Sequence, residues 1–188
     1  MQKGFTLIEM IVVISIIAIL ATIVAPNAYK MIEKAKIAKA VTGFNTIASA
    51  ANAYFSDTGI YPPNCANETA CKSSNFFRDV SSNVGWNGPY LQQWPIPGWV
   101  SPEGNKSDFL WQGDWADFDG NGIGNECAAI NFRTADATFS QLRGVKIDQA
   151  LDDGNLSTGT FRSGSALTAP YNTCPNCVYY SVGEESQP

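Results

Sequence analysis

An apolar stretch of 21 residues near the start of the chain, residues 5–25, constrains the fold more than any other feature. As a helix it would rise about 1.5 Å per residue, enough to cross a hydrocarbon layer about 30 Å thick. Its one ionisable side chain is Glu9. A carboxylate in such a span costs about 2.5–3.5 kcal/mol, so it is expected to have a partner and a role. Because the stretch contains no Lys, Arg or His, we expect the partner to be the α-amino group of a second copy.

The run KGFTLIE at residues 3–9 resembles the leader and cleavage site of the type IV pilin superfamily, which includes pilins and the pseudopilins of type II secretion. The resemblance implies that a dedicated peptidase removes residues 1–4 by cutting between Gly4 and Phe5, and that Phe5 is then N-methylated. It also implies that Glu9 neutralises the N-terminal amine of an adjacent subunit during assembly. Pro26 matches a proline that is common in the family.

Two ordinary alternatives are a secretory signal peptide and a plain single-span anchor. The first needs a small-x-small cleavage site after its core, and the sequence before Pro26 is a poor one. The second accounts for the length but not for Glu9. Lysines after the span favour a cytoplasmic C-terminal part, whereas five downstream cysteines and a calcium-like loop favour an oxidising, calcium-containing exterior. We expect a single-pass inner (cytoplasmic) membrane protein with its head outside the cytoplasm, and a periplasmic or extracellular filament after assembly.

Beyond Pro26 the pattern becomes amphipathic. A stripe at helical spacing predicts one long helix over residues 5–57, with residues 5–25 in the membrane or filament core and the second half packed on a head formed by residues 58–188. Gly59 and the prolines that follow are expected to end it. Short strands are predicted at 109–112, 129–134, 159–163 and 178–182, a helix at 136–151 and a turn at 152–155. The fold class is therefore α+β, pilin-like, with a small antiparallel sheet. The residues of the stripe are Ile37, Val41, Phe44, Ala48, Ala51 and Phe55.

Two further segments resemble those of major pseudopilins. Residues 54–63 match a Y-x-x-D-x-G-x-Y-P pattern, and residues 88–95 match G-P-Y-L-x-x-x-P. Residues 96–99 then depart from the Asp-Pro-Trp-Gly type segment of that group. The resemblance therefore indicates the superfamily without selecting a secretion pseudopilus, a pilus or a DNA-uptake filament.

The composition of the head narrows the function further. Residues 1–40 carry a net charge of +3 and the remainder −8, which argues against nucleic acid as the main partner. The chain has no histidine and no visible nucleophile–base pair, so we do not expect an enzyme. Five tryptophans fall between Trp86 and Trp115; a small core beside the helix is favoured over an exposed aromatic platform.

Residues 114–126 predict a calcium site. Oxygen side chains alternate at positions 117, 119 and 121, the spacing of EF-hand positions 1, 3 and 5, but position 12 is Ala128 rather than Glu. Five acids and no Lys or Arg lie between residues 107 and 132, and a divalent cation would relieve their repulsion. The alternative is a solvated turn. The expected ligands are Asp114, Asp117, Asp119, Asn121, Ile123 through its carbonyl, and Glu126.

The odd number of cysteines means that they cannot all pair within one chain. Cys65 and Cys71 bracket a short polar loop and are expected to form a structural disulfide. Cys174 and Cys177 form a CxxC without signs of a redox fold, so a second disulfide is expected there. Cys127 is then free or exchanges into that second pair.

Taken together, these features predict a structural subunit that polymerises into a type IV pilus-like filament. Its expected partners are other copies of itself, the prepilin peptidase, an inner-membrane assembly platform and minor pilins or pseudopilins. The alternative is a membrane-anchored extracellular calcium-dependent binding or adhesion module, with the aromatic cluster as its ligand surface.

Overall fold

The computed structural model describes residues 4–65, 71, 74–80, 82, 84–99, 108–116, 125–131, 137–164 and 177–183; for 108, 112–116, 125–131 and 137–140 only the backbone is described. The chain divides into two compact units, Met1–Lys36 and Ile37–Pro188. Each unit is described by itself below.

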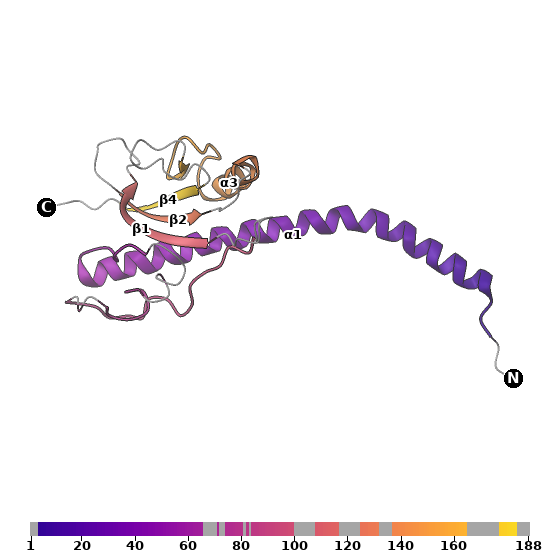
Figure 1. Ribbon diagram of the computed structural model, residues 1–188, viewed down its shortest axis with the longest axis horizontal. Coiled ribbons are helices and arrows are strands. Elements are labelled where there is room, and N and C mark those ends of the chain that lie inside the picture. Colours follow the sequence, from indigo (N-terminus) through magenta and orange to yellow (C-terminus); the bar gives the residue numbers. More distant parts are fainter. Residues whose placement is uncertain are drawn as a thin grey trace. The chain divides into compact units, whose positions relative to one another are not determined.

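One helix, α1 (Leu7–Thr58), runs for 52 residues and belongs to both units (Figure 1). It continues through Pro26, which has no N–H to give to the carbonyl four residues earlier. Its end is set by Gly59, whose φ of 78° lies in the left-handed region and whose N–H bonds to the carbonyl of Phe55 at 2.7 Å. This is the glycine cap that the sequence predicts.

In the first unit the apolar side chains of α1 are exposed. The helix is long and apolar enough to cross a membrane, and none of its most apolar stretch is buried. Ile8, Ile14 and Ile19 are 69%, 61% and 62% exposed. Burying such surface is worth about 25 cal/mol per Å², so this stretch is expected to be covered by lipid or by other helices.

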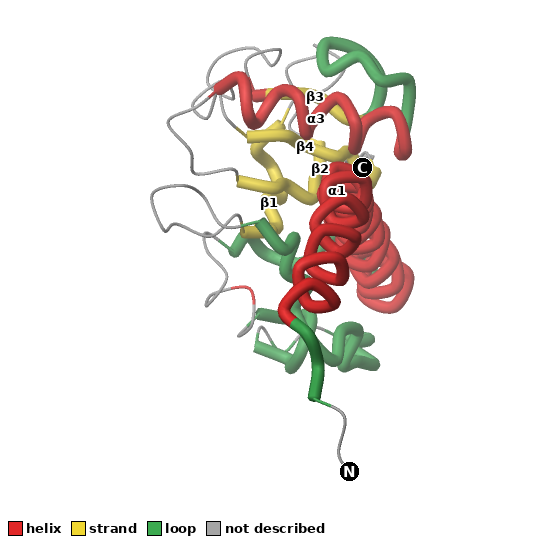
Figure 2. Tube along the Cα trace, turned by 90° about the vertical axis from the view of Figure 1, so that its right-hand side faces the viewer, coloured by secondary structure: helices red, strands yellow, loops and turns green. Residues whose placement is uncertain are grey.

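The second unit is built on a four-stranded antiparallel sheet (Figures 1 and 2). Its strands are β1 (Asp108–Ala116), β2 (Asn125–Asn131), β3 (Phe161–Ser163) and β4 (Cys177–Gly183), in the order β1-β2-β4-β3. A further helix, α3 (Ala137–Leu151), follows β2. The α+β class with a long N-terminal helix and a small antiparallel sheet is confirmed.

The elements lie close to their predicted positions. The structure has α3 where a helix was predicted at 136–151, and it places β3 and β4 where short strands were predicted. The second strand was predicted too late: β2 begins at residue 125 rather than 129. It is a central strand that pairs with β1 on one side and β4 on the other, and these ladders extend it over polar residues that have little β propensity of their own.

The face of α1 that packs on the sheet differs from the predicted stripe. Phe44 and Ala51 of the stripe are buried, but Ile37, Val41, Ala48 and Phe55 are only half-buried. The buried face is turned by about one residue around the helix, because the Phe109 ring of β1 packs against Gly43 and the neighbouring residues on that side of α1 are buried with it. Its members are Ala40, Gly43, Phe44, Ile47, Ala50, Ala51 and Tyr54.

Candidate functional site

The start of α1 is closed by a reciprocal pair of hydrogen bonds between Thr6 and Glu9. The backbone N–H and the hydroxyl of Thr6 donate to Oε2 of Glu9, at 2.8 and 2.7 Å, and the N–H of Glu9 donates to the Thr6 hydroxyl at 3.3 Å. This is a capping box, in which the first free N–H groups of a helix are satisfied by side chains. The T-x-x-E spacing before an apolar run is a sequence signal for such a capping box. The expectation for Glu9 rested only on its charge in an apolar span and did not use this signal.

The capping box uses only one of the two carboxylate oxygens of Glu9. Among the described residues, Oε1 of Glu9 receives no hydrogen bond. Glu9 is also exposed. The carboxylate can therefore cap its own helix and still accept a hydrogen bond from a cation outside the chain.

The predicted cleavage position is accessible. Gly4 and Phe5 precede the helix and are exposed, and Phe5 is 77% exposed. A Cβ at residue 4 would meet no atom of the described residues within 4 Å. Any requirement for glycine there therefore comes from something other than the packing of this chain.

The two pseudopilin-like segments meet in the structure. The Tyr90 hydroxyl donates to the Asp57 carboxylate at 2.9 Å, which joins residues 54–63 to residues 88–95. The Tyr90 ring lies edge-on to that of Tyr54, with centroids 5.4 Å apart, and the Tyr54 hydroxyl accepts from Asn75 at 2.9 Å. Burial raises the pKa of Tyr90, and its contact with Asp57 raises it further, against the N–H of Asn87. Tyr90 thus stays protonated and able to donate.

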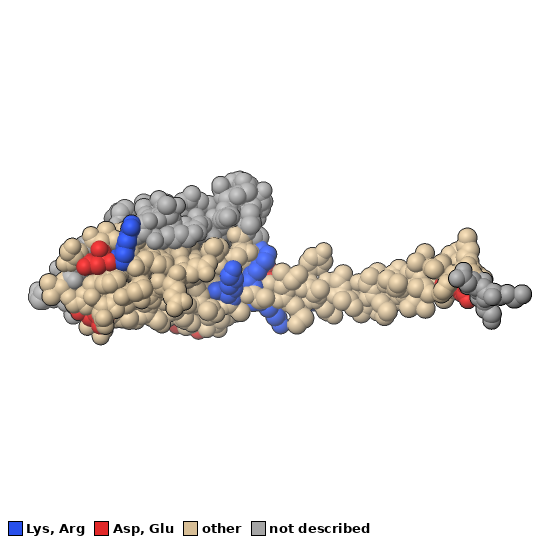
Figure 3. Space-filling model, turned by 90° about the horizontal axis from the view of Figure 1, so that it is seen from below, with Lys and Arg blue, Asp and Glu red and all other residues tan. Residues whose placement is uncertain are grey.

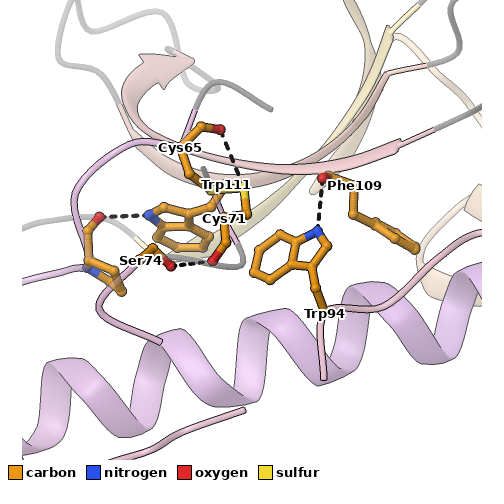
Figure 4. The surroundings of a disulfide bond; sticks show 7 residues. Cys65, Cys71, Ser74, Trp94, Phe109 and Trp111 are labelled. Carbon is orange, nitrogen blue, oxygen red and sulfur yellow. Dashed lines mark hydrogen bonds between the residues drawn. A yellow bond between two sulfur atoms is a disulfide. The ribbon is translucent and has the colours of Figure 1, made fainter. Parts of the chain in front are cut away.

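A disulfide joins Cys65 and Cys71, and the Trp111 side chain lies beside it (Figure 4). The backbone of Cys65 also pairs with that of Trp111 on β1 in an isolated antiparallel β-bridge. The N–H of Cys65 donates to the Trp111 carbonyl at 3.0 Å. The indole N–H of Trp111 donates to the carbonyl of Pro62 at 2.7 Å, and that of Trp94 donates to the carbonyl of Phe109 at 3.0 Å.

Three of the five tryptophans, Trp94, Trp99 and Trp111, are at most 3% exposed. They fill the core as expected, which removes most of the aromatic platform on which the adhesion alternative depended. The side chain of Trp115 lies outside the described residues.

The second predicted disulfide is described in part. Cys177 is disulfide-bonded, and Cys174 lies outside the described residues. Cys127 pairs with Ser181 in the β2–β4 ladder, whereas Cys177 pairs with Asn131. Four residues of strand separate Cys127 from Cys177 by about 13 Å, well beyond the reach of a disulfide. The pairing of Cys177 with Cys174 therefore stays a prediction that the register favours.

The predicted calcium ligands bracket the connection between β1 and β2. Asp114 lies in β1 and Glu126 in β2, and the pairing of Ala116 with Asn125 brings the two ends of the connection together. Asp117, Asp119, Asn121 and Ile123 lie outside the described residues, as do the side chains of Asp114 and Glu126.

Comparisons with known proteins bear on this arrangement. Over 118 residues the chain is 32% identical to the type II secretion system core protein G of Pseudomonas aeruginosa, which covers 63% of this chain and 80% of that protein. Over 143 residues it is 31% identical to the type IV major pilin protein PilE1 of Neisseria gonorrhoeae, and this match covers 73% of this chain and 67% of that protein. The chain belongs to the type IV pilin superfamily.

Other matches locate the features of this pilin superfamily member. Residues 1–25 match the family model "Prokaryotic N-terminal methylation motif", and residues 31–120 match "PilW, C-terminal". The core protein G of Vibrio cholerae is 44% identical over 61 residues, 32% of this chain and 42% of that protein. No solved structure matches. The exposed apolar helix α1 of this chain fits a membrane-anchored pilin with the head outside the cytoplasm.

Proposed function

We propose that this protein is a structural subunit that polymerises into a type IV pilus-like filament, after cleavage between Gly4 and Phe5 and N-methylation of Phe5. The observation that carries the proposal is Glu9: it caps an exposed apolar helix with one oxygen and offers the other to the outside. Superfamily membership supports the same role, which is structural rather than catalytic.

The apolar helix has two environments open to it, and both are needed for a filament. Before assembly, lipid covers residues 5–25, and Lys30, Lys34 and Lys36 follow the span, where long basic side chains can reach the headgroups. Figure 3 shows the long uncharged stretch of helix with basic side chains gathered beyond it. In a filament, packing against other copies of the helix replaces the lipid.

Glu9 makes that replacement selective. In an apolar helix bundle, a carboxylate and an α-ammonium group are each costly alone and are stabilised as a pair. A neighbouring subunit that brings its Phe5 amine to Glu9 therefore has the correct axial position, whereas a shifted neighbour leaves both charges unpaired. The charge pair acts chiefly as a register device.

Three variants separate the charge of Glu9 from its cap. Glu9→Gln keeps the capping box, since Gln also serves at this position, but removes the negative charge. Thr6→Val removes the cap and keeps the charge, and Glu9→Ala removes both. We expect filaments to be lost with Glu9→Gln and Glu9→Ala, while processing and membrane insertion remain normal, and to persist with Thr6→Val.

The readouts are filament counts by electron microscopy, the mass of the mature N-terminus and fractionation of membranes. Normal filaments from Glu9→Gln would show that only the cap matters and would reject the pairing. An intact Met1 in the mature wild-type protein would reject filament maturation altogether.

The proposal implies further partners and compartments. Prepilin peptidase would process residues 1–4, and an inner-membrane assembly platform with minor pilins or pseudopilins would build the filament. The subunit would wait in the inner membrane and end in a periplasmic or extracellular filament. Co-purification of the detergent-solubilised chain with platform components tests this.

We also propose that the β1–β2 connection binds calcium through Asp117, Asp119 and Asn121, the carbonyl of Ile123, and Asp114 or Glu126. The ligand spacing supports this, together with the hairpin that brings both ends of the connection to one place. Chelation should lower the melting temperature of the full chain in detergent, and Asp117→Ala should remove that response. Coincident melting curves with chelator and with millimolar calcium would reject the site.

A further inference from the structure

Three carboxylates converge where α3 ends, at a place that the sequence presents only as a turn. Asp148 lies in the last turn of α3, and Asp152 and Asp153 follow the helix directly. One oxygen from each side chain lies within 4.8 Å of the others. Two ligands on opposite sides of a calcium ion, at 2.3–2.6 Å each, are about 5 Å apart, so one ion can reach all three oxygens.

The decisive member is Asp148. It has no exposed surface, and neither of its carboxylate oxygens has a hydrogen-bond partner among the described residues. Buried carboxylates are nearly always hydrogen-bonded or paired, because an unpaired one carries the full cost of desolvation. The side chain of Asp148 lies against two further carboxylates, and the part of the chain that the structure describes offers it no hydrogen-bond partner.

The other two carboxylates are held in place by the loop that follows. Asp152 Oδ2 accepts from the N–H of Thr160, from its hydroxyl at 3.1 Å and from the N–H of Phe161 at 3.4 Å. Asp153 accepts from the N–H of Asn155 at 2.7 Å and the hydroxyl of Thr158 at 2.6 Å. Both are at the surface, so an ion can enter from solvent.

The charge around the cluster is negative even after its neighbours are counted. The hydrogen bonds from Thr158 and Asn155 lower the pKa of Asp153, and the nearby charge of Arg162 lowers it a little more. One guanidinium does not balance three carboxylates. The carbonyl end of α3 adds a partial negative charge, about half an elementary charge, which disfavours anions at this end of a helix.

We propose that Asp148, Asp152 and Asp153 bind a divalent cation of the calcium type, at a site separate from the β1–β2 connection. Oxygen-only ligands of this charge suit a hard cation, and carbonyls or water would complete its shell. The ion ties the end of α3 to the start of β3, since Asp152 already reaches Thr160 and Phe161. The site is independent of the filament role.

The test is calcium titration calorimetry on the full-length protein in detergent micelles, before any assembly. Asp148→Asn and Asp153→Asn keep the shape of the side chains and remove one charge each. Each is expected to lower the number of bound calcium ions by one and to remove about 5 °C of calcium-induced increase in melting temperature. The control, Asp79→Asn, removes an exposed charge elsewhere in the head and should change neither value.

Combination with Asp117→Ala distinguishes this site from the β1–β2 connection. If both sites bind, Asp117→Ala removes one ion and Asp117→Ala with Asp153→Asn removes two. Because Asp153 is exposed, its substitution leaves the fold intact even if Asp148→Asn does not. The proposal is overturned if the wild type binds no calcium, if Asp153→Asn binds as many ions as the wild type, or if Asp117→Ala alone abolishes all binding.

Discussion

The ring of Phe109 lies directly on the backbone of Gly43. A Cβ at residue 43 would sit 2.4 Å from Cζ and 2.6 Å from Cε2 of that ring, closer than real Cβ contacts. Phe44 packs edge-on beside it, with ring centroids 5.2 Å apart and planes at 89°. The absence of a side chain at one position of α1 therefore sets how closely β1 approaches the helix.

Gly43→Ala should lower the free energy of unfolding by up to about 2 kcal/mol. Alanine favours the helix by about 1 kcal/mol, but pushing Phe109 out of a packed core costs about 1–3 kcal/mol. Denaturant unfolding of the full chain in detergent measures the change. Phe109→Leu provides the partner for a double-mutant cycle, since a smaller side chain makes room for the methyl group. Strictly additive effects would contradict the contact.

The bond between Tyr90 and Asp57 should couple the end of α1 to the G-P-Y-L segment. In a cycle of Tyr90→Phe and Asp57→Ala, we expect an interaction energy of about 0.5–1.5 kcal/mol, the net range for a typical hydrogen bond, because Asp57 is exposed and solvent screens its charge. Thermal or denaturant unfolding of the four proteins provides the values. A coupling of zero would mean that the two segments are held by ring packing alone.

Replacing Gly4 should separate processing from stability. Because a Cβ there meets none of the described residues, Gly4→Ala and Gly4→Leu should leave the melting temperature unchanged. Uncleaved precursor should accumulate, more with Leu than with Ala, since the larger side chain crowds a peptidase site. Mass spectrometry of the membrane fraction shows the ratio of precursor to mature chain. Normal cleavage of Gly4→Leu would place the cut elsewhere.

Asp148 should make stability depend on pH when calcium is absent. Burial and, after it, the charges of Asp153 and Asp152 together raise its pKa from 3.8 to about 6; the N–H of Gly154 opposes this without forming a hydrogen bond of standard geometry. The folded state therefore binds more protons than the unfolded state between about pH 4 and pH 6. Stability is highest below that window and falls as the pH rises through it.

The expected loss on ionising Asp148 is on the order of 3 kcal/mol by pH 7. Unfolding free energies in chelator from pH 4 to pH 7 measure it, and Asp148→Asn should flatten the curve. Calcium should offset much of the loss at pH 7, because it stabilises the ionised form. An unchanged pH profile in Asp148→Asn would show that the carboxylate is not the group that titrates.

Local features of the sequence were enough to predict most helices and strands and to identify the superfamily. The apolar run over residues 5–25, the glycine that ends α1 and the short polar loop between Cys65 and Cys71 each act over a few residues, so spacing and composition predict them. The same holds for the T-x-x-E signal of Thr6 and Glu9, which is local and readable although the charge argument did not use it.

Tertiary structure alone decided which face of α1 is buried and where the acidic cluster forms. The predicted stripe and the observed face differ by a small rotation, because Phe109 arrives from more than 60 residues away and selects Gly43. In the sequence, Asp148, Asp152 and Asp153 have the pattern of an ordinary helix end and turn. Only the folded structure shows that Asp148 is buried beside the other two carboxylates. Burial and the loss of hydrogen-bonding water depend on distant segments, and no pattern along the chain encodes them.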